Sequence, residues 1–330
     1  MKLATVLTPP SDSNLRLAAQ CGVTEIVARY PGPDLKRLAQ QQRHYAGFGL
    51  TLSVVEGYLP IENIKIGRDD GSEVAAMKQL IREMGRLRIP LLCYNFMAGT
   101  DWVRTQLDAP ERGGAKVTAF RLRDAEQAML LGRHGAVADT DPADGADPAD
   151  CITADMLWVN LERFLREVLP VAEEAGVVLA MHPDDPPLAE FQRKARIMNR
   201  MEGFERLVQL VPSSSNAVCF CQGTFAEMGE DIPAAIRRLG SHIRYVHFRD
   251  VRGTAESFAE TFHDNGPTDM AAAMQAYADI GFRGPIRPDH VPQLDGEDDG
   301  EPGYTIKGRL FAWGYIRGLM HGVQRSTEPM

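Results

Sequence analysis

The chain has 330 residues, a formal net charge of −9 and 44% hydrophobic residues, which is typical of a globular protein with a sizeable core. The acidic balance gives no support for nucleic-acid binding, so we expect no nucleic-acid partner. No apolar run approaches the ~20 residues of a membrane span, and the N-terminal MKLATVLTPPSDS is a poor signal peptide. The five cysteines, an odd number in a long chain, favour a reducing compartment and predict a cytoplasmic location.

Short apolar runs alternate along the chain with longer stretches of helical spacing. The expected strands are residues 2–7, 24–29, 50–56, 90–96, 177–182, 216–221, 243–248 and 285–289. The expected helices are residues 13–21, 34–47, 73–87, 155–175, 199–210, 231–239, 269–280 and 306–323. This alternation predicts an α/β fold, a (β/α)8 TIM barrel that forms a single catalytic domain over residues 1–330. A doubly wound sheet is the alternative, but no GxGxxG turn follows the first strand, so we expect no nucleotide cofactor.

The alternation is interrupted between the fourth strand and the helix near residue 155. The gap of about sixty residues far exceeds a usual βα loop and predicts an insertion in the fourth βα loop at about 97–153. Within it, residues 117–133 have a charged helical pattern, and the acidic GAVADTDPADGADPADCIT (135–153) is expected to be an exposed loop. Because the insertion emerges at the face where barrel active sites lie, part of it is a candidate lid; a neutral surface excursion is the alternative.

Polar residues stand at the carboxyl ends of the last four expected strands. They are His182, Cys221, His247 and Asp289, one from each strand. In a barrel these strand ends converge on one rim. Alone, each residue has an ordinary structural explanation, such as a buried cysteine or a helix-capping aspartate. Together, two imidazoles, a thiolate and a carboxylate form a complete ligand set for a divalent transition metal, so the pattern predicts a metal site.

Strand alternation places two cations beside these ligands. Arg249 shares a strand face with His247, and Arg287 shares one with Asp289. An arginine there suits a substrate carboxylate, which it can bind bidentately, and a salt bridge to an acid of the rim is the alternative. Cys219 shares the face of Cys221 one layer deeper, where we expect it to pack.

Three further residues are candidates for chemistry or substrate binding. His290 follows Asp289 directly and points elsewhere, and an imidazole that the metal does not use is a candidate general acid or base. The polar loop ETFHDNGPTDM supplies His263 as a candidate substrate-binding residue. Tyr304 follows a glycine-rich segment that could bring it over the site; a partly exposed tyrosine at a helix start is the alternative.

Several segments, in this order and spacing, resemble the D-mannonate dehydratase family, metal-dependent barrels of the xylose isomerase-like superfamily. They are LSVVEGYLPIENIKIG (52–67), LCYNFMAGTDWVRTQL (92–107), MHPDDPP (181–187), FCQGT (220–224), HFRD (247–250), ETFHDNGPTDM (260–270), RPDHVP (287–292) and PGY with GRLFAWGYIRGL (302–319).

By this resemblance the metal ligands are His182, Cys221, His247 and Asp289, and the proton-transfer residues are His290 and Tyr304. The metal of the family is usually Mn²⁺, and Fe²⁺, Co²⁺ or Zn²⁺ would also suit these donors. Asn95, in the matching LCYNF segment, is a further candidate for substrate binding. The chain departs from the family at VLTPPSD, where a Trp-Tyr-Gly-Pro-type motif is expected, and near Ile61, where a histidine is expected.

The resemblance implies a hydro-lyase of hexuronate catabolism that converts D-mannonate, or a related aldonate, to 2-keto-3-deoxy-D-gluconate and water. The expected partner is a small sugar acid, and a homo-oligomer of two or more subunits is expected because related barrels often associate. A sugar isomerase or epimerase on the same barrel is one alternative, and a non-catalytic protein with a structural zinc is another. An endonuclease is disfavoured by the charge of −9 and the single ligand set.

Overall fold

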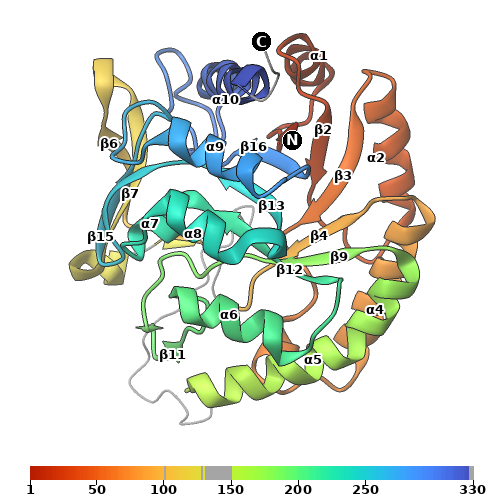
Figure 1. Ribbon diagram of the computed structural model, residues 1–330. Coiled ribbons are helices and arrows are strands. Elements are labelled where there is room, and N and C mark those ends of the chain that lie inside the picture. The colour runs from red at the N-terminus through yellow and green to blue at the C-terminus, as the bar shows by residue number, and fades with distance from the viewer. Residues whose placement is uncertain (100–101, 128, 131–150, 327–330) are drawn as a thin grey trace.

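The computed structural model describes residues 1–99, 102–127, 129–130 and 151–326. Eight short strands form its centre: β1 (Lys2–Thr5), β2 (Glu25–Ala28), β3 (Thr51–Glu56), β4 (Leu91–Tyr94), β9 (Val178–Met181), β12 (Asn216–Cys221), β13 (Ile243–Phe248) and β16 (Pro285–Pro288). They close into a barrel in the order β1-β16-β13-β12-β9-β4-β3-β2 (Figure 1). The predicted (β/α)8 TIM barrel is confirmed, and the closed sheet excludes a doubly wound fold.

Helices cover the outside of the barrel (Figure 1). The long ones are α1 (Asp12–Gln20), α2 (Lys36–Ala46), α4 (Ser72–Arg86), α5 (Ala154–Ala175), α6 (Met201–Leu210), α8 (Ile232–Leu239), α9 (Met270–Asp279) and α10 (Ile306–Ser326). Shorter turns are α3 (Glu62–Lys65), α7 (Gln222–Glu227) and η4 (Gly240–His242). Within the described residues, no helix combines the length and apolar character needed to span a membrane.

The barrel strands are apolar because both of their faces are covered. Every residue of β4 and of β12 is buried, as expected for parallel strands between a barrel interior and a helical layer. The register sets neighbouring strands at fixed heights: Cys221 pairs with His247, and His247 pairs with Arg287. Asp289 follows the end of β16 directly. The strand pairing therefore brings these polar residues to one end of the barrel.

The connections after β4 and β13 contain extra strands that join outside the barrel. The fourth connection holds β5 (Val103–Arg104), β6 (Gln106–Pro110), η1 (Arg112–Gly114), β7 (Lys116–Arg121), η2 (Leu122–Gln127) and β8 (Met129–Leu130). The seventh holds β14 (Val251–Thr254) and β15 (Ser257–Glu260), and β10 (Glu190–Phe191) and β11 (Lys194–Ala195) form a small hairpin after β9. Strands β14, β15, β7 and β6 make one antiparallel sheet from two distant segments.

The predicted helical stretch over 117–133 is wrong. Residues 116–121 form β7, which pairs on one side with β6 and on the other with β15. Its central residues are β-branched, small or aromatic and all buried, so pairing with a distant strand outweighs the charged pattern. Of the acidic segment 135–153, residues 135–150 lie outside the described part; Cys151 is exposed, Ile152 is buried and Thr153 caps α5.

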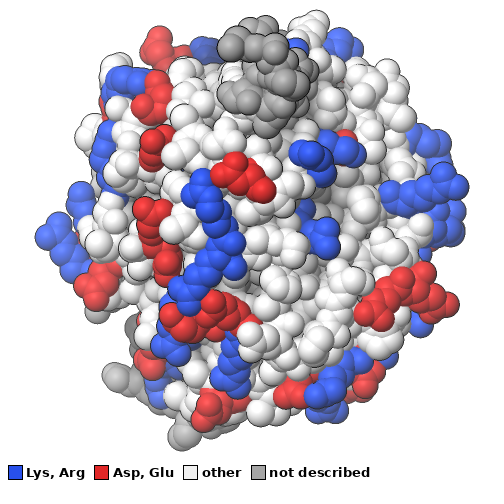
Figure 2. Space-filling view, viewed as in Figure 1, with Lys and Arg blue, Asp and Glu red and all other residues white. Residues whose placement is uncertain are grey.

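Charges of both signs alternate on the face of the molecule in Figure 2, where Lys and Arg lie beside Asp and Glu. Exposed side chains of the protein form ion pairs such as Arg238 with Glu205 and Arg237 with Asp279. On this face the described residues form no broad basic surface, in keeping with the net charge of −9.

Candidate metal centre and proton-transfer site

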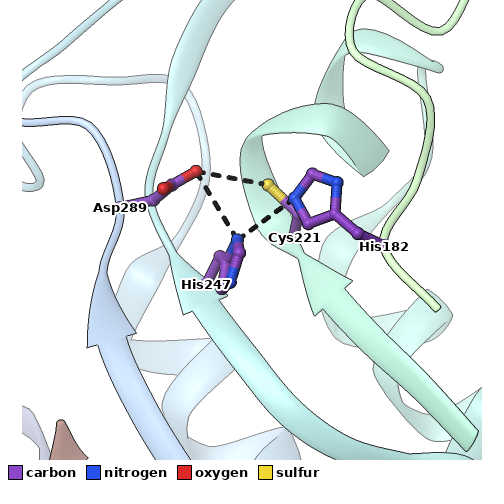
Figure 3. Close-up of side chains that lie close together, drawn as sticks. All are labelled: His182, Cys221, His247 and Asp289. Atoms are coloured by element: carbon purple, nitrogen blue, oxygen red, sulfur yellow. Dashed lines mark hydrogen bonds and ion pairs between the residues drawn. The ribbon is translucent and has the colours of Figure 1, made fainter. Parts of the chain in front are cut away.

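Four side chains at the carboxyl ends of the barrel strands point toward one another. They are His182, Cys221, His247 and Asp289, and their potential ligand atoms all lie within 4.8 Å of one another (Figure 3). Nε2 of His182 lies 3.1 Å from Nδ1 of His247. Oδ2 of Asp289 lies 3.6 Å from the same Nδ1 and 3.8 Å from Sγ of Cys221. The four residues that the sequence analysis selected at the ends of expected strands are therefore brought together by the fold.

Both imidazoles are oriented by partners on their other nitrogen. Nδ1 of His182 lies 2.7 Å from the carbonyl oxygen of Pro183, which leaves Nε2 facing the cluster. Nε2 of His247 lies 3.2 Å from Oε2 of Glu56, which leaves Nδ1 facing the cluster. A metal-binding histidine is usually held by this kind of hydrogen bond to a carbonyl or carboxylate. The surroundings of both rings therefore suit metal ligands.

The carboxylate of Asp289 is ionised although it is buried. Burial alone would raise its pKa, but the neighbouring imidazole of His290 and the positive charge of Arg287 outweigh that effect and hold the pKa well below its usual value. Nη1 of Arg287 lies 2.7 Å from Oδ1 of Asp289, and Nη1 of Arg249 lies 3.2 Å from Oδ2. An ionised carboxylate, two imidazoles and a thiol in this geometry fit a divalent transition metal.

His290 lies beside the cluster and is held by a second carboxylate. Its Nδ1 is 2.8 Å from Oε1 of Glu260, and its Nε2 is 3.8 Å from Oδ1 of Asp289. The indole of Trp102 stacks on the imidazole at 4.1 Å between ring centroids. Burial is the largest effect on His290 and lowers its pKa, despite the two neighbouring carboxylates. The ring is therefore fixed in place, with Nδ1 paired to Glu260 and Nε2 on the side of the cluster.

Tyr304 lines the same cavity as His290 and three of the ligands, His182, His247 and Asp289. Its ring centroid is 5.6 Å from that of His290, and the guanidinium groups of Arg29 and Arg309 lie 5.6 and 4.9 Å from it. Burial raises the pKa of the Tyr304 hydroxyl, so the group keeps its proton near neutral pH. Tyr304 is only 4% exposed, so it is not the partly exposed tyrosine at a helix start that the sequence left as the alternative.

The four predicted substrate-binding residues occupy different places. Arg287 and Asn95 line the cavity, and Oδ1 of Asn95 accepts a hydrogen bond of 3.0 Å from Nζ of Lys65. Arg249 and His263 are buried and do not belong to the described lining. Arg249 instead pairs with acids, including Asp289, so its contacts match the salt-bridge alternative.

Other residues of the site were not selected from the sequence. Arg29 and Glu56 stand at the ends of the second and third expected strands, so the rule applied to the late strands would have found them. Nη1 of Arg29 lies 2.9 Å from Oε1 of Glu56, and both residues line the cavity. Trp102 and Glu260 come from the extra strands or the loops beside them. Both lie in segments that carry the family resemblance, but neither stands at the end of a barrel strand.

A family model described as D-mannonate dehydratase (UxuA) matches residues 11–329 of the chain. The chain belongs to this family. A mannonate dehydratase of Oceanobacillus iheyensis is 35% identical over 294 residues, which cover 86% of this chain and 84% of the relative. Mannonate dehydratase 2 of Halalkalibacterium halodurans is 33% identical over 301 residues, covering 83% of each chain.

Solved structures agree with this assignment. A mannonate dehydratase from Streptococcus suis serotype 2 superposes with a TM-score of 0.85 and 29% identity, covering 100% of this chain and 97% of that one. An L-ribulose 3-epimerase superposes with a TM-score of 0.60 at 17% identity, covering 100% of both chains, and shows the fold alone. As a member of the D-mannonate dehydratase family, the chain is an enzyme, a hydro-lyase.

Proposed function

We propose that this member of the family dehydrates D-mannonate, or a closely related aldonate, to 2-keto-3-deoxy-D-gluconate and water. The observation that carries the proposal is one cavity in which His290 and Tyr304 stand beside His182, His247 and Asp289, three members of the four-donor cluster. Elimination of water needs a base at C2, an acid at the C3 hydroxyl and stabilisation of negative charge on the carboxylate. The cavity contains a candidate for each of these tasks.

His182, Cys221, His247 and Asp289 are the residues that we propose hold the metal. Mn²⁺ is the ion we propose, on the resemblance to the family, with Fe²⁺, Co²⁺ and Zn²⁺ as alternatives compatible with these donors. When bound there, the metal would act as a Lewis acid toward the substrate carboxylate and the adjacent hydroxyl. The remaining steps are assigned to side chains of the cavity.

We propose that His290 removes the proton from C2 of the substrate. Its Nδ1 pairs with Glu260. Burial alone would raise the pKa of that carboxyl, but Arg249, the hydrogen bond with His290 and Arg104 outweigh that effect and lower the pKa to about 2, so it is an ionised acceptor. The pairing favours the tautomer with hydrogen on Nδ1, which leaves Nε2 as a proton acceptor. That nitrogen lies 3.8 Å from a carboxylate oxygen of Asp289, within reach of a substrate held by the cluster. His290 is thus the general base.

Tyr304 is the matching general acid. Its hydroxyl is protonated, because burial raises its pKa, and it lies in the same cavity lining as His290. We propose that it donates its proton to the departing C3 hydroxyl, which then leaves as water. The enol that remains tautomerises to the 2-keto-3-deoxy acid by taking a proton at C3 and releasing that of its hydroxyl, and proton exchange with solvent restores neutral His290 and protonated Tyr304. Trp102 covers one face of the His290 ring and limits the access of solvent to the base.

For substrate binding we propose Arg287 and Asn95, together with Arg29 and Lys65, which also line the cavity. The cations are suited to the carboxylate of an aldonate, and the amide is suited to its hydroxyls. Arg249 and His263 lie behind this lining, so we propose no direct substrate contact for them. Arg249 is instead a positioning residue for Asp289.

The test is an assay of the purified, Mn²⁺-loaded enzyme over a panel of aldonates that differ in configuration at C2 and C3. Release of a 2-keto-3-deoxy acid from D-mannonate, with a smaller rate for its epimers, supports the proposal. An isomeric sugar as product would indicate an isomerase or epimerase. Metal bound stoichiometrically, with no reaction of any aldonate and no exchange of the C2 proton in heavy water, would indicate a structural site.

A further inference from the structure

A second group of potential metal ligands lies deeper in the barrel. Cys93 on β4 and Cys219 on β12 belong to one buried cluster in the barrel, together with Ala180 of the intervening strand β9. Both thiols are reduced and almost fully buried, with 1% and 0% exposure. The alanine has only a methyl group, so the strand between the two cysteines adds little side-chain bulk at this level.

Ligand atoms of Cys93, Cys219 and His247 all lie within 4.8 Å of one another. Cys219 precedes Cys221 by two residues on the same strand, so both thiols face the same side at successive levels. The deeper group therefore continues the first ligand set toward the barrel floor, with His247 common to both. It differs from the first set in having two sulfur donors and no carboxylate.

The deeper group is accessible from the cavity of the site. Cys93 lines that cavity, as do His247 and His182. An ion that enters the cavity can therefore meet the thiol of Cys93 without any opening of the barrel. The mechanism proposed above uses neither Cys93 nor Cys219.

We propose that Cys93, Cys219 and His247 form a second metal site, selective for thiophilic divalent cations such as Zn²⁺ and Cd²⁺. Sulfur donors favour soft ions, whereas carboxylate and imidazole suit Mn²⁺. Each thiol that binds releases its proton to solvent. Because His247 serves both groups, an ion at the deeper site competes for a ligand of the first. The competition, unlike the binding itself, rests on the proposed function.

The test uses Cd²⁺ as the probe and the charge-transfer absorbance of the cadmium–thiolate bond as the readout. The starting protein is the full chain with Cys21→Ala and Cys151→Ala, which leaves the three buried thiols. In this background Cys221→Ser removes the thiol of the first set, and Cys219→Ala or Cys93→Ala removes one thiol of the deeper pair. Circular dichroism and thermal unfolding establish that each metal-free variant is folded.

We expect the Cys221→Ser protein to retain cadmium–thiolate absorbance that saturates at one equivalent. Further substitution of Cys219 by alanine should lower its affinity for Cd²⁺ by about tenfold or more, as loss of a metal contact does. Loss of all thiolate absorbance in Cys221→Ser alone would overturn the proposal, as would unchanged affinity after removal of Cys219. A conservative Cys219→Ser variant replaces the alanine variant if the latter is unfolded.

A second measurement tests the competition. In the Mn²⁺-activated enzyme, Cys219→Ala should raise the Cd²⁺ concentration for half-inhibition by about tenfold relative to the parent protein. Equal inhibition of both proteins would overturn the sharing of His247. If no aldonate is dehydrated, the proposed function fails, while the cadmium–thiolate absorbance still decides whether the deeper site exists.

Discussion

The metal ligands and the proton-transfer residues share one cavity but are positioned by different parts of the molecule. The ligands stand at strand ends, where barrel register sets their height, and Glu56 at the end of β3 orients His247. His290 depends on Glu260 of β15 and on Trp102 from the fourth connection. The barrel strands therefore position the metal centre, whereas the extra strands and loops provide the surroundings of His290.

The largest effect is expected from substitution of Asp289, a proposed metal ligand that the barrel strands position. Asp289→Asn removes the only carboxylate of the four-donor set, so metal should be lost on dialysis. Turnover should fall by about a thousandfold or more, because a catalytic metal contributes several kcal/mol to the reaction. Metal analysis and an aldonate assay measure both. Asp298→Asn, at an exposed carboxylate, is the matched control. Full metal content and turnover in Asp289→Asn would contradict the ligand assignment.

Substitution of the proton-transfer residues should separate metal binding from turnover. His290→Asn and Tyr304→Phe should each retain metal, yet lose about 10²–10⁴-fold in turnover, the usual contribution of general acid–base catalysis. His290→Asn should also stop exchange of the C2 proton with solvent, while Tyr304→Phe should allow it. Equal exchange in the two variants would refute the division into base and acid.

Glu260→Gln tests the surroundings of His290 that the extra strands and loops provide, and it leaves the four proposed metal ligands unsubstituted. The amide cannot hold Nδ1–H of His290 as the ionised carboxylate does, so we expect turnover to fall by about 10- to 100-fold, as for other orienting partners. Metal affinity should fall less than in Glu56→Gln, because Glu260 contacts none of the four donors directly and reaches Asp289 through Arg249. A pH–rate profile should shift along with turnover, since the environment of the base has changed.

Glu56→Gln is the corresponding test of the metal centre that the barrel strands position. Glu56 lies 3.2 Å from Nε2 of His247 and 2.7 Å from Arg287, so its loss disturbs one ligand and the cation that holds another. We expect metal affinity to fall by about 10- to 100-fold, and saturating Mn²⁺ to restore most of the turnover. Two opposite results would contradict this division between barrel and loops. They are loss of turnover with unchanged metal affinity in Glu56→Gln, and loss of metal affinity with unchanged turnover in Glu260→Gln.

The last effect concerns the pH dependence of folding stability through His263, which lies with Glu260 in the seventh connection. Burial lowers the pKa of His263 to about 4 from an ordinary value of 6.5. The unfolded chain therefore takes up a proton between pH 6.5 and 4 that the folded chain does not, and the free energy of unfolding falls as pH drops through this window. The loss should approach 3 kcal/mol, as an order of magnitude, at pH 4.

Urea unfolding of the parent and His263→Gln proteins across this range measures the effect. The variant should have a shallower dependence of stability on pH, because its amide does not titrate. His242→Gln is the control, at a histidine that is exposed on the η4 turn. The same slope in the parent and in His263→Gln would show that His263 is not the group responsible.

Sequence reasoning found the barrel strands and the ligand cluster because both depend on local regularities. The run NAVCFC, for example, is strand β12 with the predicted bounds, and its last residue is Cys221. Alternation along a strand then decides which neighbours share a face. The same reasoning, applied to the early strands, would have reached Arg29 and Glu56.

The remaining features depend on segments that meet only in the folded chain. Strand β7 exists because it pairs with β15, more than a hundred residues later, and its local pattern favoured a helix. His290 meets Trp102 across an even larger separation, and Glu260 across 30 residues. The sequence by itself determined the barrel and its four converging donors, since strand period and length are local properties. Only the tertiary structure decided which carboxylates orient His247 and His290, because Glu56 and Glu260 come from other segments whose positions local pattern does not encode.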